Sequence, residues 1–122
     1  MHDTIQRMLA ISPEVRYVAL YQRGSLTTAS RPDLSGASSA ESDKYEELLV
    51  NPTLLTLVRQ RGNIDCGGLE YVVIRYGNFF EVVAPIDQGH ASVGVEASSD
   101  LLRLVPRILA VVAAQSPAPA TG

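Results

Sequence analysis

Three consecutive strand patterns in the second half of the chain constrain its fold more than any other feature. Residues 69–76, 79–86 and 90–97 are rich in β-branched and aromatic side chains, and the connections between them hold Gly77-Asn78 and Asp87-Gln88-Gly89, residue types that favour tight turns. Strands joined by tight turns run antiparallel and lie side by side. The segment therefore predicts a three-stranded antiparallel meander, which is a scaffold and not in itself a reaction site.

The rest of the chain completes one small α/β domain of the α+β type. Apolar spacing and turn residues predict, in chain order, a helix at 3–10, strands at 15–22 and 26–30 around a turn at Arg23-Gly24-Ser25, a helical segment at 41–61, and a last helix capped by Ser98 or Ser99. The order α-β-β-α-β-β-β-α fills residues 1–114 as a single domain. We expect residues 31–43 to form a flexible loop and residues 115–122 a disordered tail.

The helical segment at 41–61 carries two unusual features. Pro52 has no backbone N–H, so it either kinks the segment or splits it into two helices, the second capped by Asn51, and Gly62 is typical of the position just past a helix end. The apolar side chains of the second half cover roughly 160° of the circumference, wider than the common one-sided stripe; they are Leu54, Leu55, Leu57 and Val58. Such a helix either lies deep in a groove or packs both on its own sheet and on a second copy of the protein.

Charge and hydropathy disfavour two kinds of partner. The net charge is −3 and the only lysine is Lys44, so the chain lacks the basic stripe that neutralises nucleic-acid phosphates. The beginning of the sequence has no apolar segment typical of a signal peptide. The longest apolar stretch, at 101–114, is interrupted by charge and proline and is shorter than the roughly 20 residues that span a bilayer. We therefore expect a cytoplasmic protein that binds neither nucleic acid nor membrane.

No combination of residues in the sequence predicts catalysis. His90 follows a turn and is either a general base or metal ligand beside Asp87 or Glu96, or a turn histidine with local hydrogen bonds, which is the commoner case. Cys66 is expected to be a small buried cysteine, because no helix N-terminus or cation lies near it to activate the thiol. Glu81 faces Glu70 or Glu96 on neighbouring strands, and solvent-exposed strand carboxylates are far commoner than acid–base pairs. We predict that the chain is not an enzyme and binds no cofactor or metal.

Four aromatic residues surround one hairpin of the meander. They are Tyr71, Tyr76, Phe79 and Phe80. Such a cluster lines either a small-molecule pocket or, more often, an ordinary core or interface. The pocket interpretation predicts an enclosed apolar cavity of several hundred Å³ with a few polar groups, on the order of known ligand sites.

The element order and several local patterns resemble the roadblock/dynein light chain family, a group with a profilin-like fold. The similarity covers about residues 3–114 and rests on Val15 to Tyr21, the Arg23-Gly24 turn with the strand after it, Tyr71 to Ile74, and Phe79 to Val93. The longer 31–43 segment and the prolines at 52 and 106 indicate a divergent, bacterial-type member. The resemblance implies a five-stranded antiparallel sheet in the order 2-1-5-4-3, with helices on both faces.

The same resemblance implies a dimer. In this family the third strands pair edge to edge and the middle helices lie side by side, which here gives an expected interface of eight residues: Tyr45, Leu48, Leu55, Arg59, Leu69, Tyr71, Val73 and Arg75. Bacterial members typically regulate small Ras-like GTPases or serve as scaffolds, and this chain has no P-loop of its own. The predicted function is a non-enzymatic dimeric regulatory or scaffold protein with a small GTPase as partner; the alternative is a small-molecule-sensing domain of profilin-like or sensor-type fold.

Overall fold

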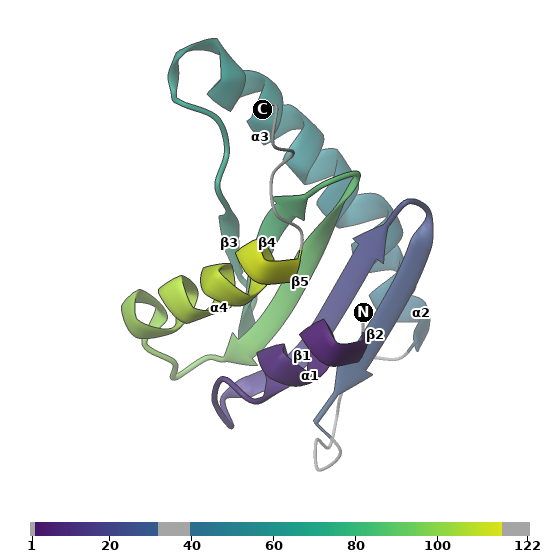
Figure 1. Ribbon diagram of the computed structural model, residues 1–122, viewed down its shortest axis with the longest axis vertical. Coiled ribbons are helices and arrows are strands. Elements are labelled where there is room, and N and C mark those ends of the chain that lie inside the picture. Colours follow the sequence, from purple (N-terminus) through teal and green to yellow (C-terminus); the bar gives the residue numbers. More distant parts are fainter. Residues whose placement is uncertain (1, 32–39, 116–122) are drawn as a thin grey trace.

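A five-stranded antiparallel sheet forms the centre of the protein (Figure 1). The computed structural model describes residues 2–31 and 40–115. The strands are β1 (Val15–Gln22), β2 (Ser25–Ser30), β3 (Val72–Arg75), β4 (Phe79–Ile86) and β5 (Gly89–Glu96). Their order across the sheet is β2-β1-β5-β4-β3, and every neighbouring pair is antiparallel. The fold class, the element order and the strand order expected from the sequence are all confirmed.

Helices cover both faces of the sheet. Helices α1 (His2–Leu9) and α4 (Leu101–Gln115) lie on one face, and α1 contacts both β1 and α4. The other face carries a long helical segment made of α2 (Ala40–Tyr45), a π-helical turn η1 (Glu46–Val50) and α3 (Asn51–Asp65). Figure 1 shows α3 extending past the end of the sheet. Among the described residues, no helix has the length and apolar character needed to cross a membrane.

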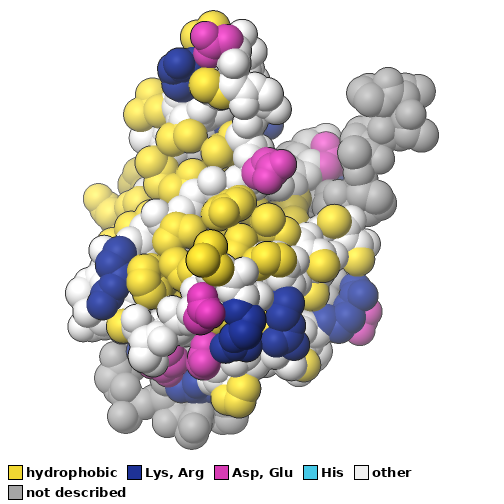
Figure 2. Space-filling model, turned by 90° about the vertical axis from the view of Figure 1, so that its left-hand side faces the viewer, with side chains coloured by type: hydrophobic (Ala, Val, Ile, Leu, Met, Phe, Trp, Pro, Cys, Tyr) yellow, Lys and Arg dark blue, Asp and Glu magenta, His cyan; other side chains and the backbone are white. Residues whose placement is uncertain are grey.

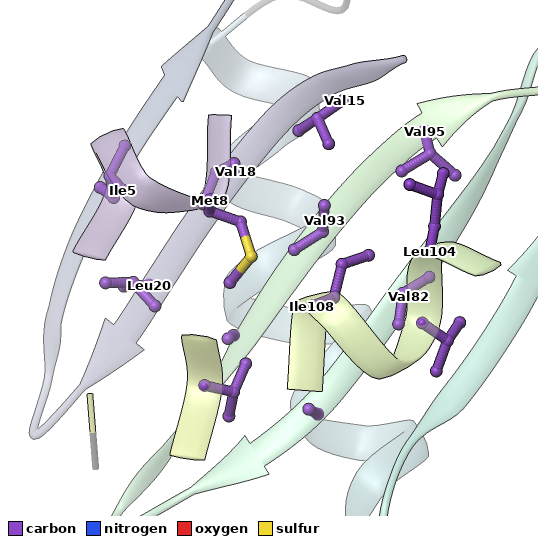
Figure 3. Close-up of a cluster of buried hydrophobic side chains, with 14 of the residues drawn as sticks. Ile5, Met8, Val15, Val18, Leu20, Val82, Val93, Val95, Leu104 and Ile108 are labelled. Atoms are coloured by element: carbon purple, nitrogen blue, oxygen red, sulfur yellow. The ribbon is translucent and has the colours of Figure 1, made fainter. Parts of the chain in front are cut away.

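The main hydrophobic core lies between the sheet and the α1/α4 layer (Figure 3). Helix α1 contributes Ile5 and Met8 and helix α4 contributes Leu104 and Ile108, each at most 1% exposed. The sheet contributes mostly valines at alternating positions, as expected for strands that turn one face toward a core: Val15, Val18, Val82, Val93 and Val95. This layer holds the greater part of the buried apolar surface, so it supplies most of the stability.

Two element boundaries differ from the sequence prediction. Strand β3 spans only Val72–Arg75 and is shorter than the predicted 69–76. Helix α3 continues past Gly62 to Asp65, so Gly62 is not the residue that follows the helix end. Gly62 lies instead where the backbone after the helix comes close to the helix. A Cβ on Gly62 would lie 3.3 Å from the Gly68 carbonyl carbon. The helix ends where Gly67 takes a φ of +80°, and the backbone N–H groups of residues 66 and 68 donate to the Gly62 carbonyl oxygen.

The last helix also begins differently from the prediction. Asp100, and neither Ser98 nor Ser99, caps α4: its carboxylate accepts a hydrogen bond of 3.1 Å from the Leu102 backbone N–H. Pro106 lies inside α4, and the helix continues through it to Gln115. On the other face of the sheet, α2 begins at Ala40, inside the predicted 31–43 loop. Residues 32–39 of that loop, and residues 116–122 of the predicted tail, lie outside the described part of the chain.

Two leucines on α4 test where the stability resides. Leu104→Ala should lower the free energy of unfolding by about 2–5 kcal/mol, because the side chain is fully buried and its loss leaves a cavity. Leu102→Ala, on the same helix but 90% exposed, should change it by less than about 0.5 kcal/mol. Urea unfolding of both variants measures the difference. Equal effects would contradict the placement of α4 on the sheet.

Candidate functional site

The π-helical turn before Pro52 positions the polar side chains of this protein. In a continuous α-helix, Pro52 would leave the carbonyl of residue 48 without its N–H donor and would clash with it. Here the residues before it widen to π-helical spacing, and the Asn51 backbone N–H donates to the Glu46 carbonyl oxygen five residues earlier. The helix is therefore not split at Pro52. Asn51 does not cap a new helix, since its φ and ψ of −66° and −44° are helical and its side chain bonds elsewhere.

This turn divides its side chains between the interior and the surface. Glu47 and Asn51 are both fully buried against the sheet. Tyr45 and Leu48, in contrast, are 64% and 49% exposed. Single-turn π-helical insertions inside α-helices are frequent at functional sites, because they redirect side chains that regular geometry would place elsewhere.

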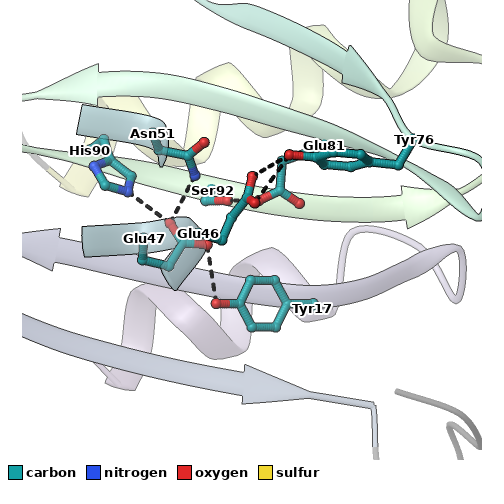
Figure 4. Close-up of polar contacts among 8 residues, drawn as sticks. All are labelled: Tyr17, Glu46, Glu47, Asn51, Tyr76, Glu81, His90 and Ser92. Carbon is teal, nitrogen blue, oxygen red and sulfur yellow. Dashed lines mark hydrogen bonds and ion pairs between the residues drawn. The ribbon is translucent and has the colours of Figure 1, made fainter. Parts of the chain in front are cut away.

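Glu47 is the centre of a buried polar cluster (Figure 4). Its Oε1 lies 2.8 Å from Nε2 of His90 on β5 and accepts a 3.0 Å hydrogen bond from the Asn51 side-chain amide. Its Oε2 accepts a 3.1 Å hydrogen bond from the Tyr17 hydroxyl on β1. Three donors from two strands and the helix itself thus converge on one carboxylate, which satisfies a group that is costly to bury unpaired.

A second carboxyl lies beside the first. Glu81, in the middle of β4, is 1% exposed and accepts a hydrogen bond from the buried Ser92 hydroxyl on β5. Glu46, next to Glu47 in the π-helical turn, accepts a 2.8 Å hydrogen bond from the Tyr76 hydroxyl. The helix and the sheet are therefore connected by polar contacts on this face, where the opposite face of the sheet has an apolar core.

The electrostatics of the cluster follow from crowding of acids in a desolvated space. Burial raises the pKa of Glu81 to about 8; the Ser92 hydroxyl opposes that shift, and the charges of Glu47 and Glu46 add to it. Burial likewise raises the pKa of Glu46 above its ordinary value, against the effect of its hydrogen bond from Tyr76. The pKa of Tyr17 is raised as well, first by burial and then by the Glu47 charge. Near neutral pH, Glu81 therefore holds its proton.

The structure corrects the predictions for His90 and Glu81. His90 is 1% exposed and bonds to Glu47, so it is neither a turn histidine with local contacts nor a partner of the two acids considered for it. Asp87 forms an ion pair with Arg23, and Glu96 forms ion pairs with two arginines of the first hairpin region. Glu81 is buried, although a solvent-exposed position was the expected one, because both faces of β4 are covered.

Cys66 also differs from the prediction. It is exposed, and its Sγ lies 3.4 Å from Oδ1 of Asp65. The residue follows the end of α3, in the part of that helix that extends past the sheet, so no core is available to cover it.

Of the four aromatic residues predicted to cluster, the structure brings two together. The rings of Tyr76 and Phe79 lie with centroids 5.3 Å apart. Phe80 faces the opposite side of the sheet, where it packs against the main core, and Tyr71 is exposed. Tyr76 and Phe79 line a cavity of about 230 Å³ between the helical segment and the sheet. Carboxyl side chains line it together with the aromatic rings, and it is smaller and less enclosed than the pocket expected from the sequence.

The eight residues of the expected dimer interface fall into two groups. Two of them already pack inside the single chain: Leu55 is 4% exposed, and Val73 packs against the main core. The other six are exposed or half-buried on the helical segment or near the β3 edge: Tyr45, Leu48, Arg59, Leu69, Tyr71 and Arg75. Whether the eight residues meet a second copy stays a prediction.

One signal in the sequence could have revealed the buried cluster. On β4, Glu81 shares a face with Phe79 and Val83, and on β5, His90 shares a face with Ser92 and Gly94. Charged residues that alternate with apolar neighbours in central strands, where both faces are covered, have no route to solvent. Glu47 and Asn51 are also spaced four residues apart, so they lie on one helix face.

Comparison with known proteins places the fold. No family model and no curated protein matches this sequence. Among solved structures, the Roadblock/LC7 domain from Streptomyces avermitilis aligns with a TM-score of 0.66 and 18% identity, over 93% of this chain and 89% of that one. The gliding protein MglB from Thermus thermophilus aligns with a TM-score of 0.67 and 10% identity, over 94% and 87%. A structure of MglB with a tetrameric arrangement aligns with a TM-score of 0.61 and 9% identity, over 91% and 86%.

The chain therefore has the fold of the Roadblock/LC7 domain. The resemblance predicted from the sequence is confirmed at the level of the fold, with identities of 9–18%. Within residues 2–31 and 40–115, no group of three His, Cys, Asp or Glu side chains is arranged to hold a metal ion. The arrangement of the cluster does two things: it docks the helix on the sheet, and it surrounds a small acidic cavity.

Glu81 should make stability depend on pH. Its folded-state pKa of about 8 lies above the ordinary value of 4.5, so the folded protein holds this proton more tightly than the unfolded chain does. The stability that this provides is complete below pH 4.5 and is lost as pH rises through 8. Between pH 5 and 9, the free energy of unfolding should therefore fall less in Glu81→Gln than in the wild type. The difference should exceed about 1.4 kcal/mol, the equivalent of one pKa unit. Urea unfolding at pH 5 to 9 measures it, with the exposed Glu70→Gln as control; parallel curves for wild type and Glu81→Gln would contradict the assignment.

Proposed function

We propose that this chain is a non-enzymatic regulatory or scaffold protein that acts as a homodimer, with a small Ras-like GTPase as its partner. The observation that carries the proposal is an apolar surface that one copy of the chain leaves uncovered, on a fold shared with Roadblock/LC7 and MglB proteins. The proposal has two parts, the dimer and the partner, and each is tested separately.

The edge of the sheet at β3 supports the dimer. Within the described residues β3 pairs with β4 alone, so its outer backbone N–H and C=O groups face outward. The strand is Val-Val-Ile-Arg and carries none of the lysine or proline that commonly protects an exposed edge. The other edge, β2, is a polar Ser-Leu-Thr-Thr-Ala-Ser strand. Antiparallel pairing of two β3 strands would satisfy the apolar edge and join two sheets.

The outer surface of the helical segment supports the same interface. Its exposed large apolar side chains are Tyr45, Leu48, Leu49, Leu57 and Ile64. Figure 2 shows hydrophobic side chains gathered over the side of the molecule that β3 occupies and reaching toward the projecting end of α3. Apolar patches of this kind, bordered by charged groups, typically mark interaction surfaces. A second copy offers the same surface in return, as a two-fold symmetric interface requires.

The partner is proposed from the fold resemblance. Bacterial members of the roadblock family typically act on small Ras-like GTPases, which bring their own nucleotide site; the sequence of this chain has no P-loop motif. The tetrameric arrangement of one MglB structure supports assembly as part of the function.

Leu48→Lys should dissociate the dimer. The substitution places a charge on the exposed outer face of the π-helical turn, where two symmetry-related copies would repel each other. The dissociation constant should rise at least about tenfold, measured by sedimentation at micromolar concentration. Leu102→Lys, a substitution of the same kind on the opposite face of the sheet, should leave the dimer intact. A wild-type protein that sediments as a 13.1 kDa monomer would refute the dimer outright.

The GTPase partner is tested with defined proteins. Small Ras-like GTPases encoded in the same genome, loaded with GDP or with a non-hydrolysable GTP analogue, should include one that binds the wild-type chain below about 10 μM in one nucleotide state. A translational GTPase from that genome is the control and should not bind. If no Ras-like GTPase binds in either nucleotide state, this half of the proposal fails and the dimer is unaffected.

A further inference from the structure

The cavity beneath the helical segment has a lining that the proposed dimer does not use. It measures about 230 Å³ and opens between the sheet and the α2/η1 part of the helix. On β5 the cavity is lined by Gly94. A Cβ added at Gly94 would lie 3.4 Å from the Phe79 ring and 3.5 Å from Oε1 of Glu81. A glycine in the middle of a central strand costs stability, but at this position it keeps the space next to both side chains open.

Aromatic rings form one part of the wall. Tyr76 and Phe79 lie at 5.3 Å with planes tilted by 40°, and Tyr17 lines the cavity from β1. The Tyr17 hydroxyl donates a hydrogen bond to Glu47, and the Tyr76 hydroxyl donates one to Glu46. Each ring is therefore fixed by its hydroxyl group as well as by its attachment to the backbone. Ring faces carry partial negative charge and attract cations, particularly when water is displaced.

Carboxyl groups from three separate elements complete the wall. Asp43 comes from α2, Glu46 from η1 and Glu81 from β4. Burial raises the pKa of each, and the charge of the neighbouring Glu47 adds to the shift in all three. A positive charge in the cavity would favour the ionised form of all three carboxyls, including Glu81, which otherwise holds its proton near neutral pH, and a neutral or anionic ligand would not.

We propose that this cavity binds a small organic ammonium ion, with the charged nitrogen between Glu46 and Glu81 and the carbon chain against Tyr76 and Phe79. The combination of ring faces and carboxyl groups distinguishes this class from a metal ion, which takes a shell of oxygen ligands and gains nothing from apolar walls. The volume is below the 300–1,000 Å³ or so of drug-sized sites, so the ligand has few heavy atoms.

Arg16 is itself part of the cavity lining, and its guanidinium lies 5.9 Å from the Phe79 ring centroid. Its Nη1 is bonded at 3.2 Å to Glu96, which does not line the cavity, so the charge of Arg16 is paired away from Glu46 and Glu81. His90 lies beyond Glu47 and is not part of the lining. Other charged or titratable groups that act on the three carboxyls are the Glu47 carboxylate, the Tyr17 and Tyr76 hydroxyls, and His90, which lowers the pKa of Glu46.

Calorimetric titration of the full chain with 1,4-diaminobutane tests the site. We expect a dissociation constant below about 1 mM, with 1,4-butanediol, which has the same chain without charge, binding at least about tenfold more weakly. Absence of diaminobutane binding at about 10 mM, or equal binding of the diol, would overturn the proposal. Mg²⁺ binding that depends on Glu46 while the amine does not bind would also overturn it.

Variants show whether the amine occupies this cavity. Glu46→Gln removes one charge and keeps an acceptor for Tyr76, so affinity should fall at least about tenfold. Phe79→Leu keeps every charge and removes a ring, so it should weaken binding as well, and it serves if Glu46→Gln does not fold. Glu70→Gln removes an exposed charge outside the lining and should leave affinity within about twofold. A loss in Glu70→Gln equal to that in Glu46→Gln would show surface attraction only, which would overturn the site. None of these outcomes depends on the dimer.

Discussion

Burial of the Glu47 carboxylate against His90 is the contact on which the arrangement of the helical face depends. Both side chains are almost without solvent access, so each would be costly to bury alone. Removing one partner would leave the polar group of the other buried without its hydrogen bond, which typically costs about 1–3 kcal/mol. The pair fixes the π-helical turn over β5, and the position of that turn decides which side chains face outward and which line the cavity.

The two faces of the sheet divide stability and recognition between them. The α1/α4 face has an apolar core that includes Met8, Leu104 and Ile108, and this core supplies the stability of the fold. The opposite face has polar contacts between sheet and helix, which are weaker sources of stability and stronger sources of geometric specificity. A protein with one well-packed face tolerates crowded carboxyl groups on the other, including one whose pKa is raised to about 8.

The sequence predicted the features that depend on local pattern. The helix and strand ranges and the turn residues were readable from local pattern, and the strand order followed from family resemblance. The pairing of Glu47 with His90 was not readable, because the two residues are separated by 43 positions and nothing local indicates the contact. Pro52 indicated an irregular helix, but the choice between a kink, a break and a π-helical turn depends on what the helix packs against. Strand β3 is shorter than its apolar pattern suggested, because it pairs with only one neighbour among the described residues.

The π-helical turn places the cavity and the outer surface within one short segment. Glu46 faces the cavity, while Tyr45 and Leu48, its neighbours in the chain, are exposed on the outside. A ligand that contacts Glu46 and a protein that covers Leu48 therefore both act on the same few backbone units. If both prefer a particular position of the turn, binding of each changes the affinity for the other, and by the same factor, since coupling of binding free energies is reciprocal. Because the turn is held by the buried Glu47–His90 pair, that pair would set how far such a preference is transmitted.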